Sequence, residues 1–242
     1  MALATSIQAW WKMDEASNTT RVDSYGSNNL TDVNSNVSQV AGKISNAASF
    51  NGTTAYLRAD DAAALSTGDI DFFASLWFKL NSTASHQSIF KKDGEYGIRY
   101  ISGAGLRFYF GSVVVVSSVT LSSGTWYHVV IYHDSSADLI GMYQRHASAS
   151  PETASDSGHG VVDGNGALNF GRDPNDSEYM NGVIDLAGCW KRVPVLQDVD
   201  GLYASGAGID YPFTVAYAIS APIHAGVGLT ANDFGPLRSF IY

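Results

Sequence analysis

Short runs of alternating apolar residues, separated by turn residues, recur along most of the chain. In segments 71–80 (DFFASLWFKL) and 126–133 (WYHVVIYH), large apolar side chains alternate as they do on a β-strand. Both faces of 126–133 are largely apolar, which predicts a central strand. His128 and His133 are five residues apart, so we expect them on opposite faces of it, where they cannot share a metal ion.

The pattern predicts an all-β fold. Strands are expected at 6–13, 47–50, 55–59, 71–80, 88–91, 96–100, 106–110, 113–119, 126–133, 139–145, 167–171 and 182–192. The Asn51-Gly52 pair predicts a hairpin-like turn between 47–50 and 55–59. The one helix candidate is 195–204. Strands that recur about every 8 to 12 residues are typical of a β-sandwich or a β-barrel.

Composition supports this fold class and excludes several others. Charged residues make up 15% of the 242 residues and hydrophobic residues 45%, so the chain can bury a core. The net charge of −9 argues against a nucleic-acid partner, which needs a surface rich in Lys and Arg. The single cysteine, Cys189, cannot form an intrachain disulfide, and inside an apolar strand it is expected to be an inert buried thiol.

The sequence shows no signal for secretion or membrane insertion. Residues 1–6 lack the basic and apolar regions of a signal peptide, and no run approaches the ~18 apolar residues of a membrane span. We therefore expect synthesis in a host cytoplasm and no membrane insertion.

The last part of the chain differs in composition from the rest. Residues 214–242 contain only two charged side chains, Asp233 and Arg238, and are too few to form a core of their own. We predict a sandwich domain over 1–213, followed by an apolar tail that either packs back on it or docks on another chain. The residues expected to dock are Phe213, Tyr217, Ile219, Phe234, Leu237, Phe240, Ile241 and Tyr242.

Four parts of the chain, in order, carry a family resemblance. They are 9–15 with 22–30, 48–52 with 56–57, 72–80 with 124–129, and 180–192 with 202–206. Together they resemble the laminin-G-like members of the concanavalin A-like lectin/glucanase jelly rolls. The resemblance covers about residues 6 to 213. It implies a jelly-roll β-sandwich in which two antiparallel sheets pack face to face, with the first strand pairing near 182–192.

The resemblance also implies a structural calcium ion, held by Asp23, Asn28 and Asp185. Oxygen ligands suit Ca²⁺. The alternative is that Asp23 caps a turn and that Asp185 accepts hydrogen bonds from backbone amides, because a carboxylate among apolar residues must be paired, hydrogen-bonded or metal-bound. The oxygen-rich segment 173–177 is interpreted as a solvated turn.

Carbohydrate binding is a further expectation, because lectins use exposed aromatic side chains near loops. The candidates are Tyr25, Tyr96, Tyr100 and Tyr179. A glycoside hydrolase is the less favoured alternative. Glucanases of the family place carboxylates in a Glu-x-Asp-x-x-Glu pattern, and none of the four glutamates here forms it.

We therefore predict a non-catalytic structural or adhesive virion protein, such as a capsid decoration or tail-fibre module. Its expected partners are other virion proteins or copies of itself, contacted through the tail, together with a cell-surface glycan. The alternative is a lectin-like carbohydrate-binding module without a virion role. One fold hosts many functions, so the sequence pattern alone does not decide between them.

Overall fold

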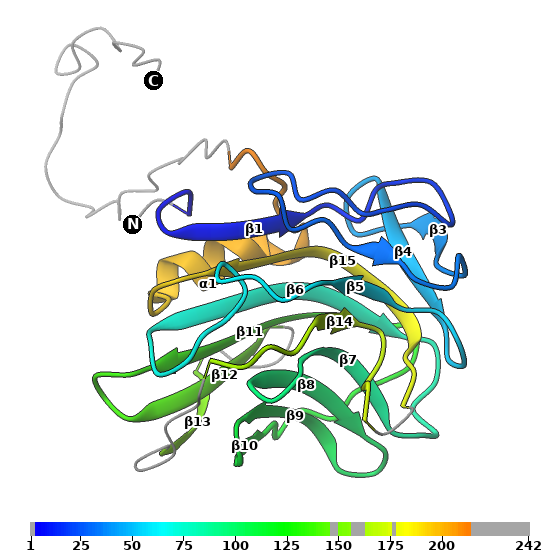
Figure 1. Cartoon of the computed structure of the whole chain (residues 1–242). Helices are drawn as coiled ribbons and strands as arrows, with labels where there is room; N and C mark the ends of the chain where they lie inside the picture. The colour runs from blue at the N-terminus through cyan, green and yellow to red at the C-terminus, as the bar shows by residue number, and fades with distance from the viewer. Residues whose placement is uncertain (1–2, 146–149, 156–162, 176–177, 214–242) are drawn as a thin grey trace, which may run out of the picture.

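The computed structural model describes residues 3–145, 150–155, 163–175 and 178–213. Two antiparallel sheets pack face to face, and one short helix lies beside the larger sheet (Figure 1). The predicted all-β sandwich is confirmed. Within the described ranges, no helix is long and apolar enough to cross a membrane.

The larger sheet has eight strands, and the smaller sheet has seven. The larger sheet runs in the order β13 (Glu152–Ser155), β12 (Leu139–Arg145), β11 (Trp126–Asp134), β6 (Phe72–Leu80), β15 (Asn181–Trp190), β4 (Asn46–Asn51) and β3 (Ser38–Ala41), with β1 (Ile7–Trp11) also paired to β15. The smaller sheet runs in the order β10 (Val113–Val116), β9 (Gly105–Phe110), β8 (Tyr96–Ile101), β7 (Gln87–Lys92), β14 (Leu168–Phe170), β5 (Leu57–Ala59) and β2 (Thr31–Asp32). The polar strands β2, β3 and β13 were not predicted.

Strand β15 joins the distant parts of the larger sheet. It pairs with β6 on one side, while β4 and β1 share its other side, β4 at residues 181–184 and β1 at 187–190. The predicted pairing of the first strand with the last is confirmed.

Apolar side chains cover both faces of the larger sheet. Its inner face packs against the smaller sheet, and its outer face carries a second buried cluster around Trp10, Trp190 and Trp77. As expected from strand periodicity, His128 packs against Trp77 in the outer cluster, with a distance of 5.1 Å between ring centroids. His133 stacks on Phe110 in the inner core, at 4.3 Å.

The helix covers part of the outer cluster. Helix α1 (Leu196–Tyr203) buries Val199 and Leu202 there, and the 3₁₀ turn η1 (Ala204–Gly206) follows it. Phe213 packs edge-on against Trp10, 5.0 Å between ring centroids. Phe213 thus packs on its own domain and stays half-buried there, and its docking on another chain stays a prediction. The other predicted docking residues, in 214–242, lie outside the described residues.

The predicted hairpin around Asn51-Gly52 is also wrong. The turn itself forms, and Gly52 has a positive φ of 79°. The Asn51 side-chain oxygen accepts hydrogen bonds from the backbone N–H groups of Thr53, Thr54 and Ala55 at 2.9 to 3.0 Å. This loop carries the chain from one sheet to the other, so β4 and β5 lie in different sheets and do not pair.

An irregularity in β15 places a carboxylate in the interior. The register between β15 and β6 shifts between Asp185 and Gly188, and Leu186 has a positive φ of 49°. Asp185 is 0% exposed. Its Oδ2 accepts hydrogen bonds from the backbone N–H groups of Lys43 (2.6 Å) and Ile44 (3.2 Å), whereas its Oδ1 is buried without a partner. Burial raises the pKa of Asp185 to about 7, although these backbone hydrogen bonds oppose the shift.

Asp185 should make stability fall as the pH rises. Its pKa is higher in the folded state than the ordinary 3.8, so the unfolded chain releases this proton first, and folding loses free energy between about pH 4 and 7. Asp185→Asn removes the ionisation while keeping the shape. Urea unfolding at pH 5 and pH 8, with EDTA present, should show the wild type losing stability relative to the variant, on the order of a few kcal/mol. An equal pH dependence of both proteins would contradict this assignment.

Candidate functional site

A row of outward-facing residues crosses the smaller sheet from one strand to the next. Because Phe108, Ile98 and Phe90 face the core, their neighbours along each strand point outward. The strand register then aligns the outward residues across the sheet. The row is Val114, Tyr109, Gly97, Lys91, Asn169, Arg58 and Thr31.

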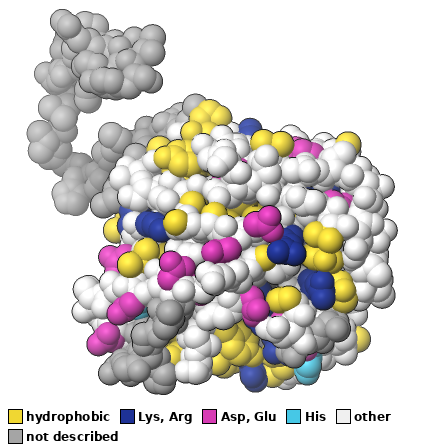
Figure 2. Space-filling model, in the orientation of Figure 1, with side chains coloured by type: hydrophobic (Ala, Val, Ile, Leu, Met, Phe, Trp, Pro, Cys, Tyr) yellow, Lys and Arg dark blue, Asp and Glu magenta, His cyan; other side chains and the backbone are white. Residues whose placement is uncertain are grey.

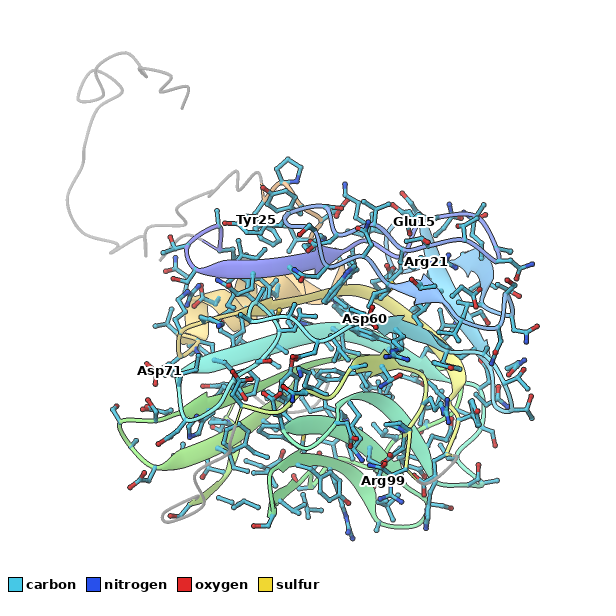
Figure 3. All side chains as sticks on the ribbon, in the orientation of Figure 1. Glu15, Arg21, Tyr25, Asp60, Asp71 and Arg99 are labelled. Carbon is cyan, nitrogen blue, oxygen red and sulfur yellow. The ribbon has the colours of Figure 1, made fainter. Side chains whose placement is uncertain are left out.

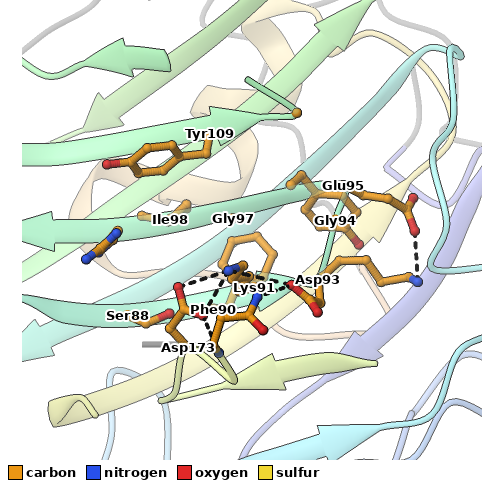
Figure 4. A pocket seen from close by; sticks show the side chains of 15 residues that line it. Ser88, Phe90, Lys91, Asp93, Gly94, Glu95, Gly97, Ile98, Tyr109 and Asp173 are labelled. Atoms are coloured by element: carbon orange, nitrogen blue, oxygen red, sulfur yellow. Dashed lines mark hydrogen bonds and ion pairs between the residues drawn. The ribbon is translucent and has the colours of Figure 1, made fainter. Parts of the chain in front are cut away.

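Gly97 leaves a gap in this row. The backbone at Gly97 lies so close to β7 that an added Cβ would come within 2.9 Å of the Phe90 carbonyl oxygen. The gap opens a hollow of about 340 Å³, which we call the first hollow; Gly97, Tyr109, Lys91, Arg99 and Asp173 are among its lining residues. Figure 4 shows the Tyr109 ring on one side and the Lys91–Asp173 pair on the other.

Charged groups around the first hollow are held in paired positions. Lys91 Nζ lies 2.8 and 3.0 Å from the two carboxylate oxygens of Asp173 and 3.6 Å from Asp93. The Asn175 side chain donates to Asp93 at 2.7 Å, and Arg99 forms a two-pronged ion pair with Glu178. The hollow therefore presents fixed polar groups and little net charge from these pairs. Acidic and basic side chains are similarly interspersed over the face in Figure 2.

A buried lysine supports the loop at the edge of the first hollow. Lys92 Nζ contacts Asp61 at 2.6 Å and Glu95 at 2.8 Å, and its side chain is fully buried. Burial opposes the charge, but the hydrogen bonds with Asp61 and Glu95 outweigh burial and raise the pKa of Lys92. Glu95 in turn accepts the Thr67 backbone N–H at 2.7 Å. These contacts fix the β7–β8 turn beneath the hollow.

A second hollow of about 210 Å³ lies beside the first, and Asp93 lines both. We call it the second hollow. Its lining includes Tyr56, Arg58, Asn169 and Arg172.

The four predicted sugar-binding tyrosines do not form one site. Tyr96 and Tyr100 are 4% and 5% exposed on the inner face of β8, so the expectation that they are exposed near loops is wrong. Tyr25 is 47% exposed and packs edge-on against Tyr211, 5.9 Å between ring centroids. Tyr179 is half-buried against Tyr56. Figure 3 shows Tyr25 far from Arg99 of the first hollow.

The geometry around Asp23 does not fit a calcium ion. The buried Asp23 carboxylate accepts hydrogen bonds from the backbone N–H groups of Trp10, Tyr25, Gly26 and Asn28, and from the Asn28 side chain, at 2.9 to 3.1 Å. Asn28 thus approaches with its donor nitrogen rather than its oxygen. The Asp23 carboxylate therefore caps a turn, which is the alternative to calcium binding stated from the sequence.

Asp185 lies apart from this turn, because its carboxylate accepts hydrogen bonds from the backbone of residues 43 and 44 instead. Its free Oδ1 is one ligand atom, whereas Ca²⁺ takes six to eight oxygens. In the part of the chain that the structure describes, no three His, Cys, Asp or Glu side chains converge as metal ligands. The calcium ion itself stays a prediction.

The residues considered for catalysis are separated or buried. Glu15, Glu95, Glu152 and Glu178 each contact a different partner. Cys189 is buried, and burial raises the pKa of its thiol to about 12, so the thiolate nucleophile does not form near neutral pH.

Sequence reasoning missed the residues that line the first hollow. Segment 173–177 was interpreted as a solvated turn, but Asp173 is 3% exposed and ion-paired with Lys91. The alternation of Gly97 and Arg99 with apolar residues was a usable signal for an outward face. The order of the strands in the sheet could not be predicted from the sequence. This order brings Tyr109 and Lys91 to the two sides of Gly97.

Comparison with solved structures shows the same fold in a toxin binding domain, in one domain of an arabinanase and in part of a sialidase. The binding domain of Paraclostridial Mosquitocidal Protein 1 superposes with a TM-score of 0.67 and 16% identity, covering 83% of this chain and 52% of that one. Domain 4 of AbnA, a GH43 extracellular arabinanase from Geobacillus stearothermophilus solved with arabinotriose, gives 0.62 and 20%, covering 80% and 96%. Trypanosoma rangeli sialidase in complex with sialic acid gives 0.63 and 15%, covering 87% and 35%.

This chain therefore corresponds to nearly all of the arabinanase domain, but to about half of the toxin binding domain and a third of the sialidase. No curated protein sequence matched. The profile of the family Laminin_G_3, described as the concanavalin A-like lectin/glucanases superfamily, matches residues 50–200, which is more than half of the chain. The chain belongs to the concanavalin A-like lectin/glucanase superfamily.

Proposed function

We propose that this chain is a non-catalytic, glycan-binding adhesive module and that the first hollow is its sugar site. The observation that carries the proposal is the gap at Gly97, which opens a hollow beside the Tyr109 ring. Fixed hydrogen-bonding groups, including Asp173 and Asn175, lie in the same lining. A cleft that combines an aromatic surface with a few placed polar groups is the usual form of a small-ligand site.

The chemistry of a sugar matches this lining. A sugar ring has an apolar C–H face, which can pack on the Tyr109 ring, and a rim of hydroxyls that need donors and acceptors. The ion pairs of Lys91 with Asp173 and of Arg99 with Glu178 keep donors and acceptors in place before binding. Fixed groups lose little conformational entropy when a ligand binds, which favours affinity.

The carboxylates in the first hollow support binding rather than hydrolysis. Asp93 and Asp173 both contact the Lys91 ammonium, and Asn175 also bonds to each of them. A glycosidase needs one protonated and one ionised carboxyl on the two sides of the scissile bond. Here Asp93 and Asp173 are engaged with the same cation on the same side of the hollow, and Glu95, the third carboxylate of the lining, is ion-paired with the buried Lys92.

We also propose that the module serves in a virion, as a capsid decoration or tail-fibre component. Support comes from the composition of residues 214–242, which are apolar and almost uncharged, and which would contact other virion proteins or copies of this chain. A virion module that binds a cell-surface glycan would use the apolar tail for assembly and the first hollow for the glycan.

Tyr109→Ala should weaken glycan binding by about tenfold, because aromatic contacts contribute about 0.5 to 1.5 kcal/mol beyond the burial of their area. Glycan-array screening of the full chain would identify a bound oligosaccharide, and calorimetric titration would measure its Kd with each variant.

Tyr25→Ala is the matched control, because it removes a tyrosine that is 47% exposed and lies outside the first hollow. It should leave the Kd unchanged. Loss of binding in Tyr25→Ala with normal binding in Tyr109→Ala would refute the assignment of the site, and an array with no bound glycan would refute the function.

The virion role is tested by chemical cross-linking of intact particles, followed by mass spectrometry. Cross-links from residues 214–242 should reach another virion protein or a second copy of the chain. Absence of the chain from purified particles, or cross-links from this segment only to residues 1–213 of the same copy, would contradict the role.

A further inference from the structure

We infer that the glycan is acidic and that Arg172, in the second hollow, binds its anionic group. This inference rests on the proposed function and names the ligand class. The two hollows differ in whether their basic side chains have carboxylate partners. In the first, both Lys91 and Arg99 have carboxylate partners within the chain. In the second, Arg172 forms no ion pair with any described residue, and its buried Nε has no hydrogen-bond partner among them.

Two tyrosines hold the Arg172 side chain in place. Its guanidinium carbon lies 4.8 Å from the centre of the Tyr56 ring and 5.5 Å from that of Tyr179. The two rings are themselves in contact, 6.4 Å between their centroids. Aromatic stacking orients a guanidinium without neutralising it, so the Nη donors that Arg172 adds to the lining of the second hollow are available to a carboxylate or a sulfate.

The remaining charges in the second hollow do not cancel this cation. Asp93 is engaged by Lys91 at 3.6 Å and by the Asn175 side chain at 2.7 Å. Arg58 adds a second positive charge, and its partner Asp60, 3.1 Å away, is largely exposed to water, where an ion pair is weak.

The sheet register joins the two hollows into one surface. Asn169 of the second hollow pairs with Lys91 of the first, on neighbouring strands that are about 4.8 Å apart. Asp93 lines both hollows. An oligosaccharide lying across the strands can therefore place one unit beside Tyr109 and a unit bearing a carboxylate or sulfate beside Arg172.

The test uses the full chain and a glycan array of matched pairs: uronic-acid oligosaccharides with their carboxyl-reduced forms, sialylated glycans with their desialylated forms, and sulfated glycans with their desulfated forms. The acidic member should bind about tenfold tighter, as expected for hydrogen bonds to a charged group, and the preferred pair tells carboxylate from sulfate. Equal binding of acidic and neutral members would overturn the inference while leaving the proposed function standing. No binding to any glycan would overturn both.

Variants then assign the preference to a residue. Arg172→Gln should remove the roughly tenfold preference for the acidic member. Arg172→Lys keeps the charge but loses the planar fork, so it should retain part of the preference, and it remains informative if the Gln variant folds poorly.

The matched control is Arg107→Gln. Arg107 is also without an ion pair among the described residues and has a buried, unpartnered Nε, but it lines neither hollow. This variant should keep the full preference. A preference that survives Arg172→Gln, or that is lost in Arg107→Gln instead, would overturn the assignment.

Discussion

The burial of two sheets against each other is the interaction on which the rest of this structure depends. Because successive strand residues face opposite sides, the inward packing of Ile98, Phe108 and Phe90 decides what the outer surface of the smaller sheet presents. The core thereby sets the Tyr109 ring and the Lys91 ammonium on the two sides of Gly97. The candidate site is thus carried by the packed sheet, and the ion pairs fix the side chains on it.

Several charged side chains of the smaller sheet interact with oppositely charged side chains close by. A low content of charged residues suits a large apolar core, and two lysines on the smaller sheet have carboxylate partners close by. Lys92 is held by Asp61 and Glu95, and Lys91 by Asp173. Arg172 differs, because tyrosine rings support it in place of a carboxylate. On this difference rests our proposal that one part of the sheet face binds sugar hydroxyls and the other binds an anion.

The sequence predicted those parts of the fold that depend on short-range periodicity. Strands such as 126–133, the opposite faces of His128 and His133, and the short helix follow from alternation and from helix-forming residues close together in the chain. The Asn51-Gly52 turn shows where this reasoning stopped. Its local conformation was predicted, but a local signal does not tell whether the next strand joins the same sheet or the opposite one.

The candidate site was harder to predict for the same reason. Its lining comes from β7, β8, β9 and the loop at 173–175, and only the strand order brings these together. Closeness to a predicted turn was a poor guide to which tyrosines are exposed. Tyr96 begins a strand whose inner face is buried, whereas Tyr109, which sequence reasoning did not select, faces outward. For Asp23, by contrast, the turn-capping alternative could be stated from the sequence, and it agrees with the hydrogen bonds of this carboxylate.

The central claim is that ligand binds on the outer face of the smaller sheet. The most direct measurement is an NMR titration of the isotope-labelled chain with the oligosaccharide that binds best. We expect the backbone amide signals of Gly97, Tyr109 and Asn175 to shift along a single saturable curve, while those around Tyr25 stay in place. Saturable shifts confined to the Tyr25 region, with the signals of the smaller sheet unchanged, would contradict it.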